Sequence, residues 1–327
     1  MRVLVLTAMY PSAERPAAGT FVKQQVESLL AAGIDVEVQA FDGAGSLKNY
    51  VRAGLEVRRR LRHEHFDLVH AHYGLTGLPA CMQTKAPVVI TYHGSDLLGE
   101  VDSAGNYTFR GRLKVLLGQI LGRRVKERIV VASVLQRRLW GRSATVIPMG
   151  VDLEAFTPIP RAEARRRLDL PPDRRTVLFV ANPANGVKRF DVAEAAVARL
   201  AEAGHLVDLL PVFKARHDEI PVYMSACDVL VLTSNHEASP CVVKEALACN
   251  LPIVSVDVGD VAERIDGVQG CYLCRRSPED VAAKLAIALS FAGRTDGRQK
   301  VQEISLANTA RSTIEVFSRA LGPTADS

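Results

Sequence analysis

Glu237-Ala-Ser-Pro-Cys-Val-Val-Lys-Glu245 is the stretch from which the architecture follows most directly. It comes straight after residues 228–234, Asp-Val-Leu-Val-Leu-Thr-Ser, an apolar run typical of a buried parallel strand. Ser239 and Pro240 predict the start of a helix, with Ser239 as N-cap and Pro240 as the first helical residue. This helix should run to about Cys249, and a further strand should follow from residue 251.

The two glutamates of this stretch should therefore lie where α/β proteins bind ligands. Glu237 would lie at the carboxyl end of a strand, beside free N–H groups of a helix N-terminus, and Glu245 about two turns into that helix. A carboxylate at Glu245 could accept hydrogen bonds from vicinal hydroxyl groups. The alternative is that both are surface glutamates, one in a loop and one on a helix face.

The wider pattern resembles the donor-site signature of the retaining nucleotide-sugar glycosyltransferases of family 4, which have the GT-B fold. Its residues here are Ser234, Glu237, Ser239, Pro240, Glu245, Gly259 and Glu263. The resemblance implies two Rossmann-like, doubly wound α/β domains facing a cleft, with a C-terminal helix that crosses back to the first domain. It also implies sugar transfer with retention at the anomeric carbon, without a metal or other cofactor.

Bulk composition is that of an ordinary soluble globular protein. The chain has 327 residues, of which 48% are hydrophobic and 24% charged, enough for two domains of about 150 residues each. A net charge of +5 over this length does not indicate a nucleic-acid partner. No apolar run approaches the roughly 20 residues needed to span a membrane. We therefore expect a cytoplasmic protein, with peripheral contact at the inner face of the membrane as a second hypothesis.

Strand and helix patterns alternate along the whole chain, which indicates βαβ units and parallel sheets. Residues 158–175 are rich in Pro and Arg and show one short helix, so they are interpreted as the linker. We expect an acceptor-side domain over residues 1–157 and a nucleotide-sugar donor domain over 158–298. A final helix from residue 299 to 321 would lead residues 299–327 back toward the first domain.

The donor phosphates need cations, and residues 182–190 follow the first strand of the second half. A Lys and an Arg at a helix N-terminus can clamp a diphosphate. The family has an Arg just after this strand and a Lys about six residues later. Lys188 matches the Lys, whereas Asn182 stands at the Arg position and Arg189 is the candidate substitute. The alternative for Lys188 is a solvated surface charge.

Two further segments, both in the acceptor-side domain, resemble the family, the first with one Gly where the family has two, and a third segment has a similar placement. Gly19 precedes a helix after the first strand, where the family has a Gly-rich segment facing the donor phosphates and the acceptor; an ordinary βα turn is the alternative. His93, in Thr91-Tyr-His-Gly-Ser-Asp96, would contact the transferred sugar, or else be a capped loop histidine. His72 ends another strand and could shape the acceptor pocket together with Tyr73 and Asp96.

The resemblance thus assigns roles residue by residue. Catalysis would rest on Glu237, His93 and Lys188. Donor binding would involve Gly19, Asn182, Lys188, Arg189, Ser239, Pro240, Cys241, Val242 and Glu245. We expect no metal site, because the chain lacks the Asp-x-Asp motif of metal-dependent GT-A enzymes and its Cys271-x-x-Cys274 pair has no second ligand pair.

Residues 110–128 carry seven basic side chains and one acid, with leucines and isoleucine at helical spacing. The preferred interpretation is an amphipathic helix whose apolar side packs on the sheet. The second is a face for anionic membrane, where lipid-linked acceptors lie.

The function predicted from the sequence is transfer of a hexose-type sugar from a nucleotide-diphosphate donor. UDP-sugar is favoured over GDP-sugar, and the acceptor is a glycan, a lipid-linked intermediate or a small molecule. Two alternatives stay open at this stage: a nucleotide-sugar epimerase or hydrolase on the same fold, and an inactive nucleotide-binding scaffold.

Overall fold

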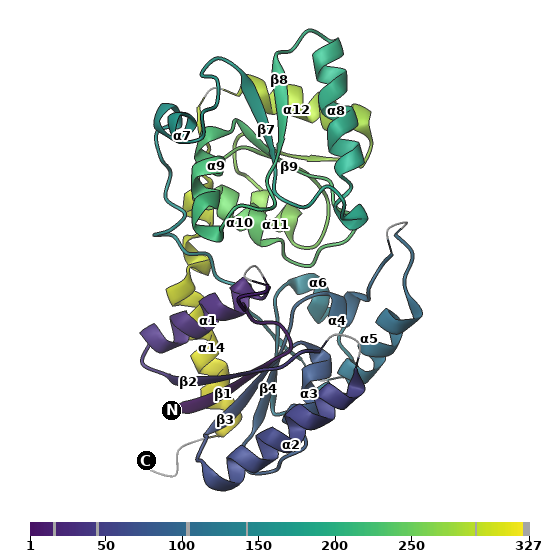
Figure 1. Cartoon of the computed structure of the whole chain (residues 1–327), viewed down its shortest axis with the longest axis vertical. Helices are drawn as coiled ribbons and strands as arrows, with labels where there is room; N and C mark the ends of the chain where they lie inside the picture. Colours follow the sequence, from purple (N-terminus) through teal and green to yellow (C-terminus); the bar gives the residue numbers. More distant parts are fainter. Residues whose placement is uncertain (16–17, 44–45, 103–104, 142, 292, 323–327) are drawn as a thin grey trace. The chain divides into compact units, whose positions relative to one another are not determined.

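The computed structural model describes residues 1–15, 18–43, 46–102, 105–141, 143–291 and 293–322. The described chain divides into two compact units. Unit 1 combines Met1–Glu100, Tyr107–Gly150 and Leu306–Ser327, and unit 2 combines Val101–Asn106 and Val151–Ser305. Each unit is an α/β domain built on a parallel sheet, as the alternating patterns predict (Figure 1).

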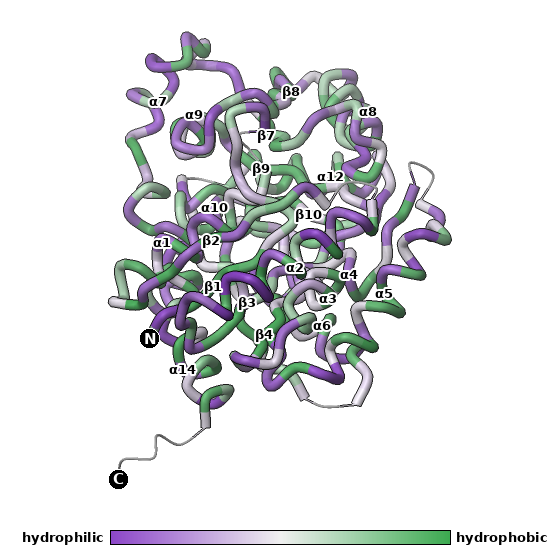
Figure 2. Tube along the Cα trace, turned by 60° about the horizontal axis from the view of Figure 1, so that its bottom comes forward, coloured by the Kyte–Doolittle hydropathy of each residue, from purple (hydrophilic) through white to green (hydrophobic). Residues whose placement is uncertain are grey.

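The described sheet of unit 1 has six parallel strands in the order β2-β1-β3-β4-β5-β6. They are β1 (Arg2–Thr7), β2 (Asp35–Ala40), β3 (Leu68–His72), β4 (Val88–Tyr92), β5 (Glu127–Val130) and β6 (Thr145–Val146). The central strands are near-continuous apolar runs because helices cover both faces of the sheet (Figure 2). The order reverses between β1 and β3, so a ligand crevice is expected at their carboxyl ends.

Helices cover both faces of this sheet (Figure 1). One face carries α1 (Thr20–Ala31) and α14 (Leu306–Leu321), and the other carries α2 (Leu47–His63), α3 (Gly77–Ala80) and α5 (Phe109–Gly122). From α14, the buried side chains of Ala310, Val316 and Phe317 enter the core of unit 1. The predicted return of the C-terminal helix to the first domain is therefore confirmed.

The sequence pattern predicts one continuous helix from residue 299, but the structure shows a break. The helix is broken into α13 (Gly297–Lys300), a short 3-10 turn η4 (Gln302–Ile304) and α14. The break arises because Val301 and Ile304 are buried in the core of unit 2, and Ser305 pairs with Val151 in an isolated bridge. The chain leaves unit 2 only after this anchor.

The described sheet of unit 2 repeats the arrangement with five parallel strands in the order β11-β10-β9-β7-β8. They are β7 (Arg175–Phe179), β8 (Val207–Pro211), β9 (Val229–Leu232), β10 (Ile253–Val256) and β11 (Cys271–Cys274). α8 (Phe190–Glu202) and α12 (Pro278–Ser290) pack together on one face, with α9 (Ile220–Ala226), α10 (Cys241–Ala248) and α11 (Val261–Ile265) on the other. Its order reverses between β7 and β9.

The segment interpreted as a linker belongs to the body of unit 2. Residues 158–175 contain α7 (Arg161–Arg167), where Ala164 and Arg165 are buried. Phe156 is also buried in the core of unit 2. Apart from the short segment Val101–Asn106, the chain passes from unit 1 to unit 2 between Gly150 and Val151 and returns between Ser305 and Leu306, rather than near residues 157 and 298.

Candidate functional site at the carboxyl ends of the strands

In unit 2, two loops meet at the carboxyl ends of β7 and β9. The Asn235 N–H donates to the carbonyl of Val187 at 2.8 Å. The Thr233 hydroxyl donates to the carbonyls of Lys188 at 3.0 Å and of Arg189 at 2.9 Å. These bonds join the segment after β7 to the segment after β9 at the point where the strand order reverses, which is where open α/β sheets bind ligands.

This joining brings Lys188 and Glu237 together. The Lys188 ammonium donates to Oε1 of Glu237 across 2.6 Å, and the two side chains are 30% and 15% exposed. The sequence gives no hint of the pair, because the two residues are 49 positions apart. A short charge-assisted bond of this kind holds both groups in fixed positions while leaving the ammonium accessible to an anion.

Glu245 lies on α10, just over one turn from its start at Cys241 rather than about two turns as expected. Its Oε1 is 3.0 Å from Nε2 of His217, which begins the short 3-10 helix η3 (His217–Glu219) after β8. The hydrogen bond to Glu245 raises the pKa of His217, and the nearby carboxylates of Asp152 and Asp218 act in the same direction. No sequence motif singles out His217, so the prediction missed it.

The predicted helix cap is wrong by one residue. Pro240 occupies the N-cap position of α10, and the side chain there makes no capping bond. The Ser239 hydroxyl instead donates to Asp260 Oδ2 at 2.8 Å and accepts from the Lys244 ammonium at 3.2 Å. Ser239 therefore anchors the loop to a buried charged network, and Cys241 and Val242 supply the first helical turn.

Asn182 stands where the family has an arginine, so this position supplies no positive charge. Asn182 is exposed, and its side-chain oxygen accepts from the Ala184 N–H at 3.0 Å within a turn. Arg189, the candidate substitute, has φ of 52° and pairs with Asp191 at 2.8 Å. The same guanidinium donates to Asn235 Oδ1 at 3.5 Å, so it contacts both its own helix and the segment after β9 that carries Glu237.

Arg276 is a second residue that sequence reasoning missed. It follows β11, and its guanidinium donates to the carbonyls of Thr233 at 3.2 Å and Ser234 at 2.9 Å. It therefore adds a positive charge to the same edge of the sheet, and burial lowers its pKa. Its place just after a strand that ends at this edge is the signal that could have found it.

In unit 1, the carboxyl ends of β3 and β4 bring the predicted histidines together. His72 Nδ1 and His93 Nε2 are 3.0 Å apart, so one of the two nitrogens carries the shared proton. Burial, with the neighbouring imidazoles, holds the pKa of His72 well below its usual value. Burial also lowers the pKa of the adjacent His70 to about 3. The imidazole of His72, packed on that of His70, thus lies against His93, whose ring also contacts Tyr73 and Phe21.

Asp96 has a mainly architectural position. Its carboxylate accepts from the backbone N–H groups of Gly74 at 3.0 Å, His93 at 3.1 Å and Gly94 at 2.8 Å. These bonds fix the loop that carries His93. The prediction grouped Asp96 with acceptor-side residues, whereas the contacts of its carboxylate are with this backbone loop.

Tyr73 borders a cavity in unit 1, and Gly19 directly follows Ala18, which also lines it. Gly19 has φ of 68°, and a Cβ atom there would lie 2.3 Å from the Met9 carbonyl oxygen, so only glycine fits. Close by, a cavity of about 280 Å³ is lined by apolar, acidic and basic groups. The lining includes Met9, Arg15, Ala18, Asp42, Tyr50, Tyr73, Ser95, Asp96, Glu100 and Lys114.

The preferred interpretation of residues 110–128 is a helix whose apolar side packs on the sheet, but α5 packs differently. Its buried positions are Gly111, Gly118, Gln119, Leu121 and Gly122, so mostly glycines face the rest of unit 1. Apart from Leu121, its large apolar side chains are turned outward, with Phe109 82% exposed. Leu113, Leu116, Leu117 and Ile120 are each more than a third exposed. Within the described residues, no helix is both long and apolar enough to cross a membrane.

Two family models match the chain. The model described as Glycosyltransferase Family 4 matches residues 2–155, and the one described as Glycosyl transferases group 1 matches residues 192–290. TuaC of Bacillus subtilis (strain 168), a candidate teichuronic acid biosynthesis glycosyltransferase, is 27% identical over 86% of this chain and 87% of its own. The D-inositol 3-phosphate glycosyltransferase of Kineococcus radiotolerans is 26% identical over 86% and 78%.

Solved structures share the fold at lower identity. Sucrose-phosphate synthase from Thermosynechococcus elongatus has a TM-score of 0.73 at 19% identity, covering 97% of this chain and 98% of that one. Anabaena HepE in complex with UDP has a TM-score of 0.70 at 16% identity, covering 98% and 100%. HepE has also been solved with UDP-glucose. With the family matches and the two parallel sheets, these findings establish that the chain is a GT-B glycosyltransferase belonging to glycosyltransferase family 4.

Proposed function

We propose that this glycosyltransferase moves a hexose from a nucleotide-diphosphate donor, with retention at the anomeric carbon, to an acceptor bound by unit 1. UDP-sugar is the favoured donor and GDP-sugar the second. The observation that carries the proposal is the Lys188–Glu237 pair at the point of strand reversal in unit 2, beside Glu245 on α10. The UDP and UDP-glucose complexes of HepE, which shares the fold, support the donor class.

Lys188 would stabilise the leaving diphosphate. Charge develops on the leaving group as the glycosidic bond breaks, and a preorganised cation offsets that charge. In the free protein the ammonium is held by Glu237, so an incoming diphosphate competes for it. Glu237 is then free to accept hydrogen bonds from the sugar hydroxyls. Arg276 and N–H groups of the first turn of α10 are further candidates for phosphate contact.

Glu245 would bind the ribose. One carboxylate oxygen is held by His217, and the other can accept from a vicinal hydroxyl. His217 would thereby set the orientation of Glu245.

The acceptor would occupy the cavity of unit 1 beside His93. Tyr73, Asp96 and the mixed charges of Arg15, Asp42, Glu100 and Lys114 line it, which suits a polar, hydroxyl-bearing molecule. The acceptor is thus a glycan, a lipid-linked intermediate or a small molecule. His93, supported by the neutral His72, would contact the transferred sugar.

The test is a transfer assay with UDP- and GDP-hexoses, each labelled at C1, and panels of glycan, lipid-linked and phosphosugar acceptors. An α-linked product from an α-linked donor, read by NMR, is the expected result. Transfer with inversion would refute retention. Donor breakdown or epimerisation without transfer to any acceptor would refute the proposed reaction.

We propose in addition that α5 contacts anionic membrane. Its outward apolar side chains lie beside Arg110, Arg112 and Arg123, a combination that inserts into the headgroup region of acidic bilayers. Co-sedimentation should retain the protein on phosphatidylglycerol vesicles but not on phosphatidylcholine vesicles. Leu116→Glu with Ile120→Glu should abolish this binding, while the same change at exposed Leu206, in unit 2, should not. Equal binding by all three proteins would contradict the proposal.

A further inference from the structure

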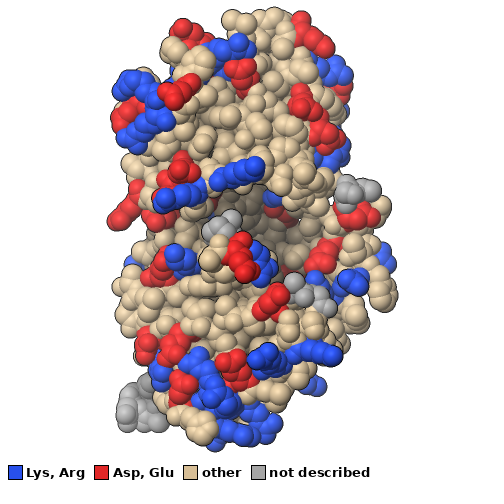
Figure 3. Space-filling model, viewed as in Figure 1, with Lys and Arg blue, Asp and Glu red and all other residues tan. Residues whose placement is uncertain are grey.

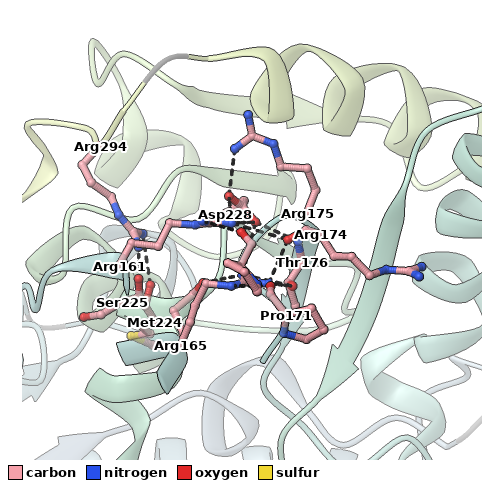
Figure 4. Close-up of polar contacts among 12 residues, drawn as sticks. Arg161, Arg165, Pro171, Arg174, Arg175, Thr176, Met224, Ser225, Asp228 and Arg294 are labelled. Carbon is pink, nitrogen blue, oxygen red and sulfur yellow. Dashed lines mark hydrogen bonds and ion pairs between the residues drawn. The ribbon is translucent and has the colours of Figure 1, made fainter. Parts of the chain in front are cut away.

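Unit 2 contains a cluster of arginines that the transferase site does not use. Arg161 and Arg165 lie on α7, Arg174 and Arg175 at the start of β7, and Arg294 after α12 (Figure 4). Lys and Arg side chains gather visibly over α7 on the face shown in Figure 3. The cluster surrounds Asp228, which directly precedes β9 and is 5% exposed.

The carboxylate of Asp228 pairs with more than one guanidinium group of this cluster. Asp228 accepts from Arg161 at 3.1 Å and Arg175 at 3.0 Å, and Arg165 lies 3.8 Å from it. Arg294 instead donates to the backbone carbonyls of Met224 at 3.1 Å and Ser225, which carry no net charge. Positive charge is therefore in excess at this place.

A cavity of about 240 Å³ opens beside the cluster. Among the described residues that line it, Arg161, Arg175 and Arg294 are cationic and Asp228 is the carboxylate. Cys227 also lines it, but burial raises the pKa of this thiol to about 12, so it adds no negative charge. Within the described chain, the buried Nε of Arg161 has no hydrogen-bond acceptor. A negatively charged ligand would supply both the missing charge and an acceptor.

The cavity lies at the opposite edge of the sheet from the candidate donor site. Arg175 begins β7 and Asp228 precedes β9, whereas Lys188 and Glu237 follow those same strands. A five-residue strand spans roughly 16 Å, so one nucleotide phosphate group cannot contact both places at once. The arginine cavity is therefore separate from the donor site.

We propose that this cavity binds a small ligand bearing a phosphate group. Guanidinium groups match phosphate in charge and in planar, two-point hydrogen-bond geometry. The cavity's apolar wall of Ala288, Leu289 and Phe291 leaves room for a short organic substituent on the phosphate. This site does not depend on the transferase proposal.

The test compares melting temperatures in phosphate, in glycerol 3-phosphate and in sodium chloride at equal ionic strength. With phosphate at about 100 times its dissociation constant, wild type should melt several degrees higher than in chloride. Arg175→Gln and Arg161→Gln should each lose this shift, and calorimetry should show at least a tenfold loss of phosphate affinity. Arg175 is the safer variant because its side chain is 54% exposed and its polar contact is with Asp228.

Two controls separate this site from others. Arg199→Gln removes a half-exposed arginine of unit 2 that also pairs with one carboxylate, and should keep the shift. Lys188→Ala should keep it too, because it alters the donor site instead. A response to phosphate alone indicates the free anion, and a response to both ligands indicates a phosphomonoester; either supports the site. The proposal would be overturned if phosphate raised the melting temperature no more than chloride does. It would also be overturned if the shift were lost only in Lys188→Ala, or kept in both Arg175→Gln and Arg161→Gln.

Discussion

Replacing Lys188 with alanine separates the structural and the catalytic roles of the Lys188–Glu237 pair. The change removes the ammonium that lies 2.6 Å from Glu237 and leaves a carboxylate that is only 15% exposed without its partner. We expect a modest loss of stability and a large loss of turnover. The two effects should respond differently to a second change, Glu237→Ala.

The stability cost follows from the geometry. A hydrogen bond to a charged group contributes about 1.5–3 kcal/mol, and the 30% exposure of Lys188 reduces this to about 1–2 kcal/mol. The melting temperature should fall by a few degrees. Removing both partners leaves no buried unpaired charge, so Lys188→Ala with Glu237→Ala should regain most of the loss. By contrast, loss of one preorganised electrostatic donor lowers kcat by about 10²–10³, and the double variant should not recover it.

The assay combines urea unfolding with steady-state sugar transfer for wild type, both single variants and the double variant. Lys214→Ala, an exposed lysine of unit 2, serves as the control and should match wild type in both measurements. Turnover of Lys188→Ala within about threefold of wild type would refute the role of Lys188 as leaving-group stabiliser. A double variant less stable than either single variant would refute the pairing argument.

Two further predictions concern His217 and Gly19. The pKa of His217 is raised in the folded state by Glu245, so its contribution to stability is fully present below its unfolded pKa of about 6.5 and is lost as pH rises through the folded pKa. In urea titrations across pH, His217→Gln should therefore differ most from wild type below about pH 6.5, and a constant difference up to pH 9 would contradict the pairing. Gly19→Ala adds a Cβ atom 2.3 Å from the Met9 carbonyl oxygen and should cost more than about 2 kcal/mol in chemical denaturation. Gly33→Ala, with φ of 83° but open space around the Cβ position, should cost only about 1 kcal/mol, and equal costs would show that the close approach is unimportant.

The fold was predictable because its signals are local. Apolar runs such as Val3 to Leu6 mark central strands, and the helix that begins at Thr20 ends just before Gly33, a residue type that commonly follows a helix. The order of these elements suffices for two doubly wound domains. The unit boundaries could not be predicted from local signals. Residues 158–175 belong to unit 2 because Arg165 is buried against partners up to 61 residues away in the sequence.

The sequence names candidate site residues but does not reveal which of them pair. Glu237, Lys188 and His93 stand at strand ends that a motif can mark, but the Lys188–Glu237 and His72–His93 contacts arise only when strands assemble. His217 reaches Glu245 across 28 positions from a loop without any motif. On α5, helical periodicity identifies an apolar side but cannot tell that Gly111, Gly118 and Gly122 form the packed side.

The most direct test of the account is calorimetric titration of UDP into wild type, Glu245→Ala and a control, Glu194→Ala, with and without Mg²⁺. Glu194 is an exposed helical glutamate of the same unit. The account predicts metal-independent UDP binding that weakens at least about tenfold in Glu245→Ala, the loss of one hydrogen bond to a charged group, and stays unchanged in the control. Equal affinity in Glu245→Ala and wild type, or no binding of UDP, GDP or ADP by wild type, would contradict the central claim that this edge of unit 2 holds the nucleotide of the donor.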